Sequence, residues 1–168
     1  VGGTSSTGNS GSIYLEDNAN LRLVGDVEMS KGGSMTLMDN ASFSFESDYS
    51  TSGGAKIVLN TNARGIVHGK VVMTNGTITL KNDSEIMVGS SLTATKGAKI
   101  TGEDNGAMFI CDYPNSTKEN TSHVSLSGNS FYGNGCFALP VVWKSFDIVV
   151  THNNISKLVW ETASEDGN

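Results

Sequence analysis

A six-residue pattern that recurs along the chain limits the possible folds more than any other feature of the sequence. Its seven copies start at Ile13, Met35, Ile57, Ile78, Ile100, Val124 and Ile148. Successive starts lie 22, 22, 21, 22, 24 and 24 residues apart. The first position is always Ile, Met or Val, and the third is Leu or Val except at Gly102. Such a period is typical of repeat proteins, in which a unit buries its apolar face only against its neighbours.

Each unit has the pattern of two or three short strands. The first and third positions are apolar and the second is often Thr, Ser or Val, which indicates a strand with one buried face. The sixth positions are Asn18, Asn40, Asn62, Asp83, Asn105, Asn129 and Asn153. Asn tolerates the left-handed backbone region, so a tight corner is predicted there. Alternation then resumes, as at Leu21 and Leu23, and four units add a third apolar stretch such as Val27 and Met29.

Stacking these units predicts an all-β fold: a single-stranded right-handed parallel β-helix of about seven rungs. Each rung would advance by about 4.8 Å, which places the corner Asn residues above one another as a ladder of amide hydrogen bonds. Asp83 should weaken this ladder because an ionised carboxylate has no donor. A β-barrel or β-sandwich is the alternative, although hairpin turns would not repeat an Asn in one column seven times.

Composition and patterning define the domain and exclude some partners. We expect a flexible lead-in over 1–12, the β-helix over 13–160 with an insertion at 112–123, and a polar tail over 161–168. The net charge of −6 and the presence of only two arginines argue against nucleic-acid binding. No apolar run is long enough to span a membrane. Uncovered end strands invite pairing, so self-association or continuation of the chain is expected at the helix ends.

The corner column and two longer phrases carry a family resemblance. VSLSGNSFYGNG (124–135) and IVVTHNNISKLVW (148–160) resemble right-handed parallel β-helix proteins with the pectate-lyase-like fold. The resemblance implies that the Asn corner joins two sheets of the coil, and it is nearest in kind to surface adhesins and autotransporter passengers. The same fold also serves polysaccharide lyases, hydrolases and phage tailspikes, so it does not specify a function.

Four residues are weak candidates for catalysis. Asp17 and Asp39 precede the corner Asn of the first two units and would lie about one strand spacing apart. Such a pair could bind Ca²⁺ or share a proton, but Asp-Asn is also ordinary turn chemistry, which we favour. Arg64 and His68 could supply the cation and base that lyase chemistry needs. Surface positions on a strand are the favoured interpretation of both.

Two cysteines and two glycosylation sequons lie near the insertion. Cys111 and Cys136 occupy nearly equal positions of successive units, so a disulfide could join the coils there and would indicate an oxidising compartment. Two buried thiols are the alternative. Asn115 and Asn120 begin the most accessible Asn-X-Ser/Thr sequons and are candidates for N-glycosylation.

Aromatic residues gather in the last two units and suggest a glycan-stacking surface. The candidates are Tyr132, Trp143 and Trp160, with an end plug for the core as the alternative interpretation. Taken together, the sequence favours a non-catalytic secreted or cell-surface module, adhesin-like or a structural stalk, that contacts glycans or host and cell-surface molecules. The alternatives are a polysaccharide-binding or polysaccharide-cleaving β-helix and a subunit of an extracellular filament.

Overall fold

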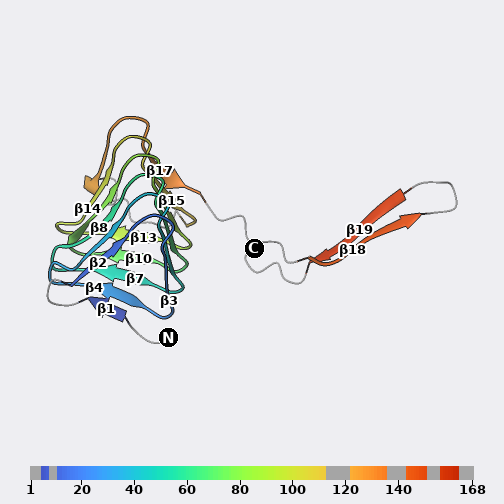
Figure 1. Ribbon diagram of the computed structural model, residues 1–168, viewed down its shortest axis with the longest axis horizontal. Helices are drawn as coiled ribbons and strands as arrows, with labels where there is room; N and C mark the ends of the chain where they lie inside the picture. Colours follow the sequence, from blue (N-terminus) through green and yellow to red (C-terminus); the bar gives the residue numbers. More distant parts are fainter. Residues whose placement is uncertain (1–4, 8–10, 113–121, 136–142, 151–155, 163–168) are drawn as a thin grey trace. The chain divides into compact units, whose positions relative to one another are not determined.

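The computed structural model describes residues 5–7, 11–112, 122–135, 143–150 and 156–162. Most of its strands form three parallel sheets (Figure 1). Sheet A contains β1 (Ser5–Thr7), β4 (Val27–Met29), β7 (Tyr49–Thr51), β10 (Val71–Met73) and β13 (Leu92–Ala94). Sheet B contains β2 (Ser12–Leu15), β5 (Ser34–Leu37), β8 (Ala55–Leu59), β11 (Gly76–Leu80), β14 (Lys99–Gly102) and β16 (Val124–Leu126). Sheet C contains β3 (Asn20–Leu23), β6 (Ser42–Phe45), β9 (Arg64–Val67), β12 (Glu85–Val88), β15 (Ala107–Ile110) and β17 (Phe131–Asn134).

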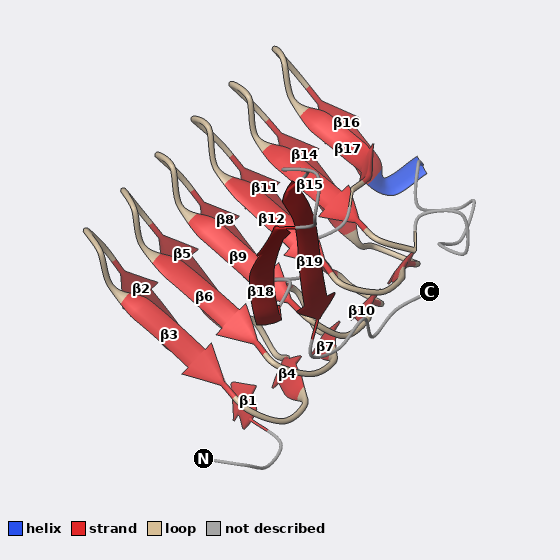
Figure 2. Cartoon of the chain, turned by 90° about the vertical axis from the view of Figure 1, so that its right-hand side faces the viewer, coloured by secondary structure: helices blue, strands red, loops and turns tan. Residues whose placement is uncertain are grey.

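The chain visits the sheets in the order B, C, A and then returns to B, so each circuit is one coil of a parallel β-solenoid (Figure 2). The first coil is β2–β4, the second β5–β7, the third β8–β10, the fourth β11–β13, the fifth β14 and β15, and the sixth β16 and β17. Strand pairing aligns the first positions of the repeat as Cα partners from Ile13 to Val124. This register confirms the predicted alignment of the first six units and the solenoid class of fold.

The interior of the solenoid is apolar because alternate residues of all three sheets point inward. The strands of β5, β6 and β8 show the buried-every-second-residue pattern, and Met35, Phe43 and Ile57 are buried almost completely. Small residues fill the corner after the turn, for example the buried Ala41 and Ala63. Burial of these columns by neighbouring coils is what a single unit could not achieve alone.

The sequence analysis missed two sheet A strands: β1, which lies within the predicted lead-in and pairs with β4, and β7. β7 forms the sheet A side of the second coil, and its inward residues are Tyr49 and Thr51. The pattern did not predict this strand because Thr51 is polar, yet it is only 3% exposed. Position in the stack therefore overrides the weak local signal.

The prediction of about seven rungs is wrong. The solenoid makes about five turns, because four coils have strands in all three sheets and the last two have described strands only in sheets B and C. The seventh repeat lies in a separate compact unit, Phe137–Asn168, and the solenoid in Val1–Cys136. In the second unit β18 (Trp143–Val150) pairs antiparallel with β19 (Ser156–Thr162). Alternation with period two is the same in a parallel coil and in a hairpin, so the sequence pattern alone could not distinguish them. Asn153 lies outside the described residues.

The corner between sheets B and C is a β-turn. The prediction that its left-handed residue is the sixth position of the repeat is only partly correct. In each of the six corners the fifth position has positive φ, at Asp17, Asp39, Thr61, Asn82, Asp104 and Gly128. The sixth position joins it only at Asn62, Asp83 and Asn105. The physical reason is the turn hydrogen bond from the seventh position to the fourth, as from Ala41 N to Met38 O at 3.1 Å. It makes both positions central turn residues, and either can be left-handed.

Candidate functional site

The corner carboxylates Asp17 and Asp39 are turn residues with φ of 58° and 59°. They lie near Tyr14, whose pKa is raised by desolvation and then by neighbouring carboxylates, including these two. Tyr14 itself donates from its hydroxyl to Met38 Sδ at 3.0 Å. Among the described residues, no group of three or more His, Cys, Asp or Glu side chains is placed to hold a metal ion. The Ca²⁺ site remains a prediction, and the turn geometry supplies the structural reason for both residues.

The candidate catalytic base and cation, His68 and Arg64, lie at the two ends of β9 and face two different carboxylates. Arg64 Nε lies 3.2 Å from Glu85 Oε1. His68 Nε2 lies 4.0 Å from Glu46 Oε1. Arg64 thus faces a carboxylate of the coil after it and His68 a carboxylate of the coil before it, so the two contacts point in opposite directions along the stack.

Glu46 is the centre of a polar cluster that the sequence analysis did not find. Arg22 Nε donates to Glu46 Oε1 at 3.0 Å, and Ser44 Oγ donates to the same oxygen at 2.7 Å. Arg22, followed by Ser44, lowers the pKa of Glu46 to about 2. The signal that could have found it is the repeat period itself, since Arg22 and Glu46 are about one coil apart.

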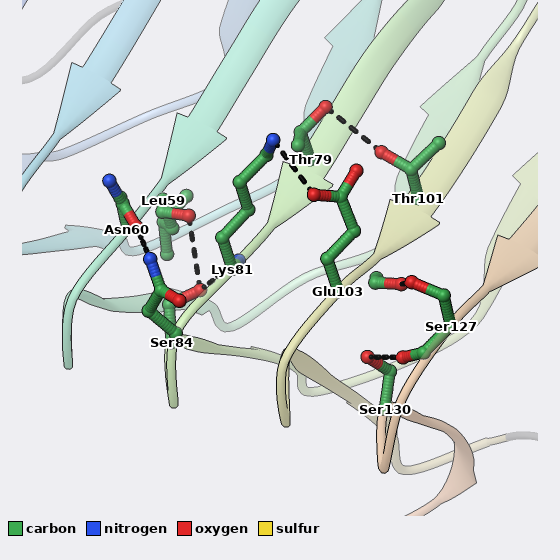
Figure 3. Close-up of polar contacts among 11 residues, drawn as sticks. Leu59, Asn60, Thr79, Lys81, Ser84, Thr101, Glu103, Ser127 and Ser130 are labelled. Atoms are coloured by element: carbon green, nitrogen blue, oxygen red, sulfur yellow. Dashed lines mark hydrogen bonds and ion pairs between the residues drawn. The ribbon is translucent and has the colours of Figure 1, made fainter.

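Polar side chains on sheet B and its corner also bond from coil to coil (Figure 3). Asn82 Nδ2 donates to Asn60 Oδ1 at 2.6 Å, and Thr101 Oγ1 donates to Thr79 Oγ1 at 3.0 Å. Lys81 and Glu103 form an ion pair at 2.9 Å. The outer face of this sheet is therefore tied together along the direction of stacking.

Among the described sixth-position residues, the predicted Asn ladder has one side-chain bond, at the position expected to be weakest. Asn105 Nδ2 donates to Asp83 Oδ1 at 2.8 Å, so Asp83 serves as an acceptor in the column. Backbone bonds continue the stack at the corners with two left-handed residues, from Asn62 N to Asn82 O and from Asp83 N to Asp104 O, both at 3.0 Å. Asn18, Asn40 and Asn129 lie at the sixth positions of their turns without positive φ.

The aromatic candidates separate into different environments. Tyr132 in β17 is half-buried and packs against the core, which disfavours a role for its ring in stacking on a ligand. Its neighbour Phe131 is 42% exposed, and its ring centroid lies 5.1 Å from that of Phe109. Trp143 and Trp160 belong to β18 and β19, and their side chains lie outside the described residues.

Three other candidates lie outside the described residues: Cys136, Asn115 and Asn120. Cys111 directly follows β15 and is half-buried. The disulfide and the two glycosylation sites therefore stay predictions.

Two cavities that described residues line lie on the outer surface of the solenoid. One, of about 290 Å³, borders sheet A and includes Asp26, Glu28, Asp48 and Lys70. Lys70 contacts Asp48 twice, since Lys70 Nζ lies 3.4 Å from Asp48 Oδ2 and the Lys70 N–H donates to Asp48 Oδ1 at 3.0 Å. With three carboxylates and one lysine among its lining residues, this cavity is acidic.

The other cavity, of about 380 Å³, lies at the start of β14 and β16, the last two strands of sheet B in chain order. Its lining includes Lys96, Lys99, Thr101, His123 and Ser125. These residues come from the fifth and sixth coils and from the turn that precedes β14. Sequence analysis did not single them out, because Lys96 and His123 are separated by the insertion and share no motif.

Comparisons with models of known protein families, with curated proteins and with solved structures gave no match. The stacked parallel sheets described above place the chain in the class of parallel β-solenoids. The part of the chain that the structure describes contains no helix long and apolar enough to cross a membrane.

Proposed function

We propose that this chain is a non-catalytic secreted or cell-surface β-solenoid module, related in kind to surface adhesins or to the stalks of passenger proteins in the pectate-lyase-like group. One observation carries the proposal: four ion pairs of the described residues join adjacent coils. Arg22–Glu46, Arg64–Glu85, Lys70–Asp48 and Lys81–Glu103 each join one coil to the next. Such contacts support a regular stack and leave these groups engaged with one another, which suits a scaffold better than a reaction centre.

The energetics of these pairs are modest one by one. Exposed ion pairs contribute about 0–1 kcal/mol each. In a stack, however, each pair strengthens an interface between adjacent repeats, and such interfaces determine the stability of a solenoid. A rod of this kind presents long outer faces to partners at fixed spacing.

The test is incubation of the protein with a panel of acidic and neutral polysaccharides, with and without Ca²⁺, followed by measurement of new chain ends. No new ends are expected for any polymer. Cleavage that disappears in Asp17→Asn/Asp39→Asn or in Arg64→Gln/His68→Asn would overturn the proposal and identify an enzyme.

A second candidate function, assembly through the end of the rod, is favoured by the first coil. Its inward residues Ile13, Leu15, Leu21 and Leu23 are only partly buried. Their partners in the second coil are almost fully buried, because coils cover them on both sides. These partners are Met35, Leu37, Phe43 and Phe45. Light scattering across a concentration series should show growth if this end pairs with another chain, and Leu15→Lys should suppress it. A constant mass for the unmodified protein would contradict end-to-end assembly.

A further inference from the structure

The cavity at the start of β14 and β16 is lined by basic side chains that are far apart in sequence. Pairing of Ile100 with Val124 and of Thr101 with Ser125 places β16 beside β14. Their preceding residues, Lys99 and His123, therefore occupy the same row in adjacent coils. Successive coils are about 4.8 Å apart, so both side chains can reach one small ligand.

The orientation of His123 is determined by a backbone contact. His123 Nδ1 lies 2.9 Å from the carbonyl oxygen of Ala98. A carbonyl oxygen only accepts hydrogen bonds, so Nδ1 carries the hydrogen and donates it. This leaves Nε2 for a ligand: in the neutral ring it accepts, as from a sugar hydroxyl, and in the protonated ring it donates to an anion.

The two lysines add positive charge at the same cavity. Lys99 is exposed on β14, and the exposed Lys96 sits in the preceding turn with φ of 56°. Among the described residues, no ion pair involves either lysine. Glu103, the next outward carboxylate along β14 and its turn, is already paired with Lys81. The cavity is therefore basic on a chain whose net charge is −6.

The shape and the remaining lining groups indicate more than a bare ion. A volume of about 380 Å³ is at the small end of the range for small-molecule sites. Hydroxyl groups of Thr101, Ser122 and Ser125 border the same space as the basic groups. Hydroxyls donate and accept, as sugar hydroxyls require, and ammonium groups bind oxyanions by charge-assisted hydrogen bonds.

We propose that this cavity binds a sugar that carries a tetrahedral oxyanion ester, a sulfate or a phosphate. Three basic side chains, Lys96, Lys99 and His123, border the cavity, and such an ester presents three terminal oxygens, one more than a carboxylate. The hydroxyl groups then contact the sugar ring. The inference rests on the proposed non-catalytic function only in that the sugar is held and not cleaved.

The experiment is a calorimetric titration of the whole chain with chondroitin 6-sulfate hexasaccharide and with the unsulfated hexasaccharide. Binding is expected for the sulfated sugar, and Lys96→Gln/Lys99→Gln should weaken it by about tenfold or more, since charge-assisted hydrogen bonds are lost. The matched control is Lys31→Gln/Lys56→Gln. Lys31 also has positive φ in the turn before a sheet B strand, and Lys56 lies in the row of Lys99 two coils away.

A separate variant tests the histidine without removing its structural contact. In His123→Asn the amide nitrogen can still donate to Ala98 O, whereas the Nε2 position is lost. Weaker binding at an unchanged melting temperature is expected. Unchanged binding would remove His123 from the site and overturn the assignment of three basic side chains to the ligand.

Several results would overturn the proposal. These are no binding, equal binding of the unsulfated hexasaccharide, equal weakening by the control pair, and equally tight binding of inorganic sulfate or of a short single-stranded DNA. Competition by glucose 6-sulfate and glucose 6-phosphate identifies which ester is preferred, and displacement by either supports the site. Sizing the hexasaccharide after titration keeps the two proposals separate, because shorter products would overturn the non-catalytic function while the lysine variants still report on the cavity.

Discussion

Gly65 provides a direct test of how tightly neighbouring coils interlock. It lies on β9 at a position that points inward, between Phe43 of the coil before and Ile86 of the coil after. A Cβ atom at Gly65 would lie 2.4 Å from the Phe43 ring and 2.6 Å from Ile86 Cγ1. Carbon atoms prefer separations of about 3.5–4.0 Å, so both neighbours would have to move by about 1 Å. The Phe43 ring thus occupies the space that a side chain at Gly65 would need.

Gly65→Ala should lower the free energy of unfolding by about 2 kcal/mol, within the usual range for overpacking. For a chain of this size that loss corresponds to about 4–8 °C in melting temperature. Urea and thermal unfolding followed by circular dichroism measure both quantities. The control is Gly97→Ala, where the nearest atom is the flexible Asn75 Oδ1 at 3.0 Å, and a change within about 0.5 kcal/mol is expected.

The decisive comparison is with Phe43→Leu/Gly65→Ala. A smaller side chain at position 43 frees the space that the new methyl group needs. The double variant should therefore be more stable than the sum of the single changes implies, by at least about 0.5 kcal/mol, because contacting residues couple. Strict additivity, or no loss in Gly65→Ala, would refute the packing argument.

Three further predictions concern polar contacts of the stack. Ser84→Ala should cost about 1–3 kcal/mol in urea unfolding, because the buried Ser84 Oγ donates to Leu59 O at 3.1 Å and the substitution leaves buried backbone groups without this partner. An unchanged midpoint would show that this corner does not depend on the hydroxyl group. Asn62→Val should destabilise by about 1–2 kcal/mol, since Asn62 has φ of 62° and a β-branched residue is strained there, whereas Asn62→Gly should fold normally. Equal stability of the two would contradict the corner assignment. Glu46 has a pKa lowered to about 2, so its stabilising contribution is complete above the unfolded value of about 4.3 and is lost as the pH falls towards 2. The melting-temperature difference between the unmodified protein and Glu46→Gln should shrink in that window, and a constant difference would rule out the Arg22 contact as its cause.

The repeat made much of the solenoid predictable. Alternation at Ile13, Met35 and Ile57 is repeated one coil later each time, and the structure pairs these residues directly. Coil-to-coil pairs such as Arg64–Glu85 follow the same period, 21 residues apart, and could have been found from it. The row that contains Lys99 and His123 has no constant residue type along the repeat, which is why the basic cavity was missed.

Two features depended on information that a one-dimensional pattern does not contain. The period-two pattern of Ile148 and Val150 suits a solenoid strand and a hairpin strand equally, and only pairing with β19 shows the antiparallel arrangement. Similarly, an Asn in a turn tolerates positive φ without requiring it. The turn at Asn18 places Asp17 in the left-handed region, and the turn at Asn62 places both central residues there.

By itself the sequence determined the parallel solenoid, because a 21–24-residue period with apolar alternation can bury its apolar face only by stacking. Tertiary structure alone decided where the stack stops and which side chains meet across coils. Lys99 and His123 are 24 residues apart, with the insertion between them, and they reach one cavity only because β16 pairs with β14 in a particular register. A shift of β16 by one residue would turn His123 to the other face of the sheet while Lys99 stayed in place, so the site exists through that register.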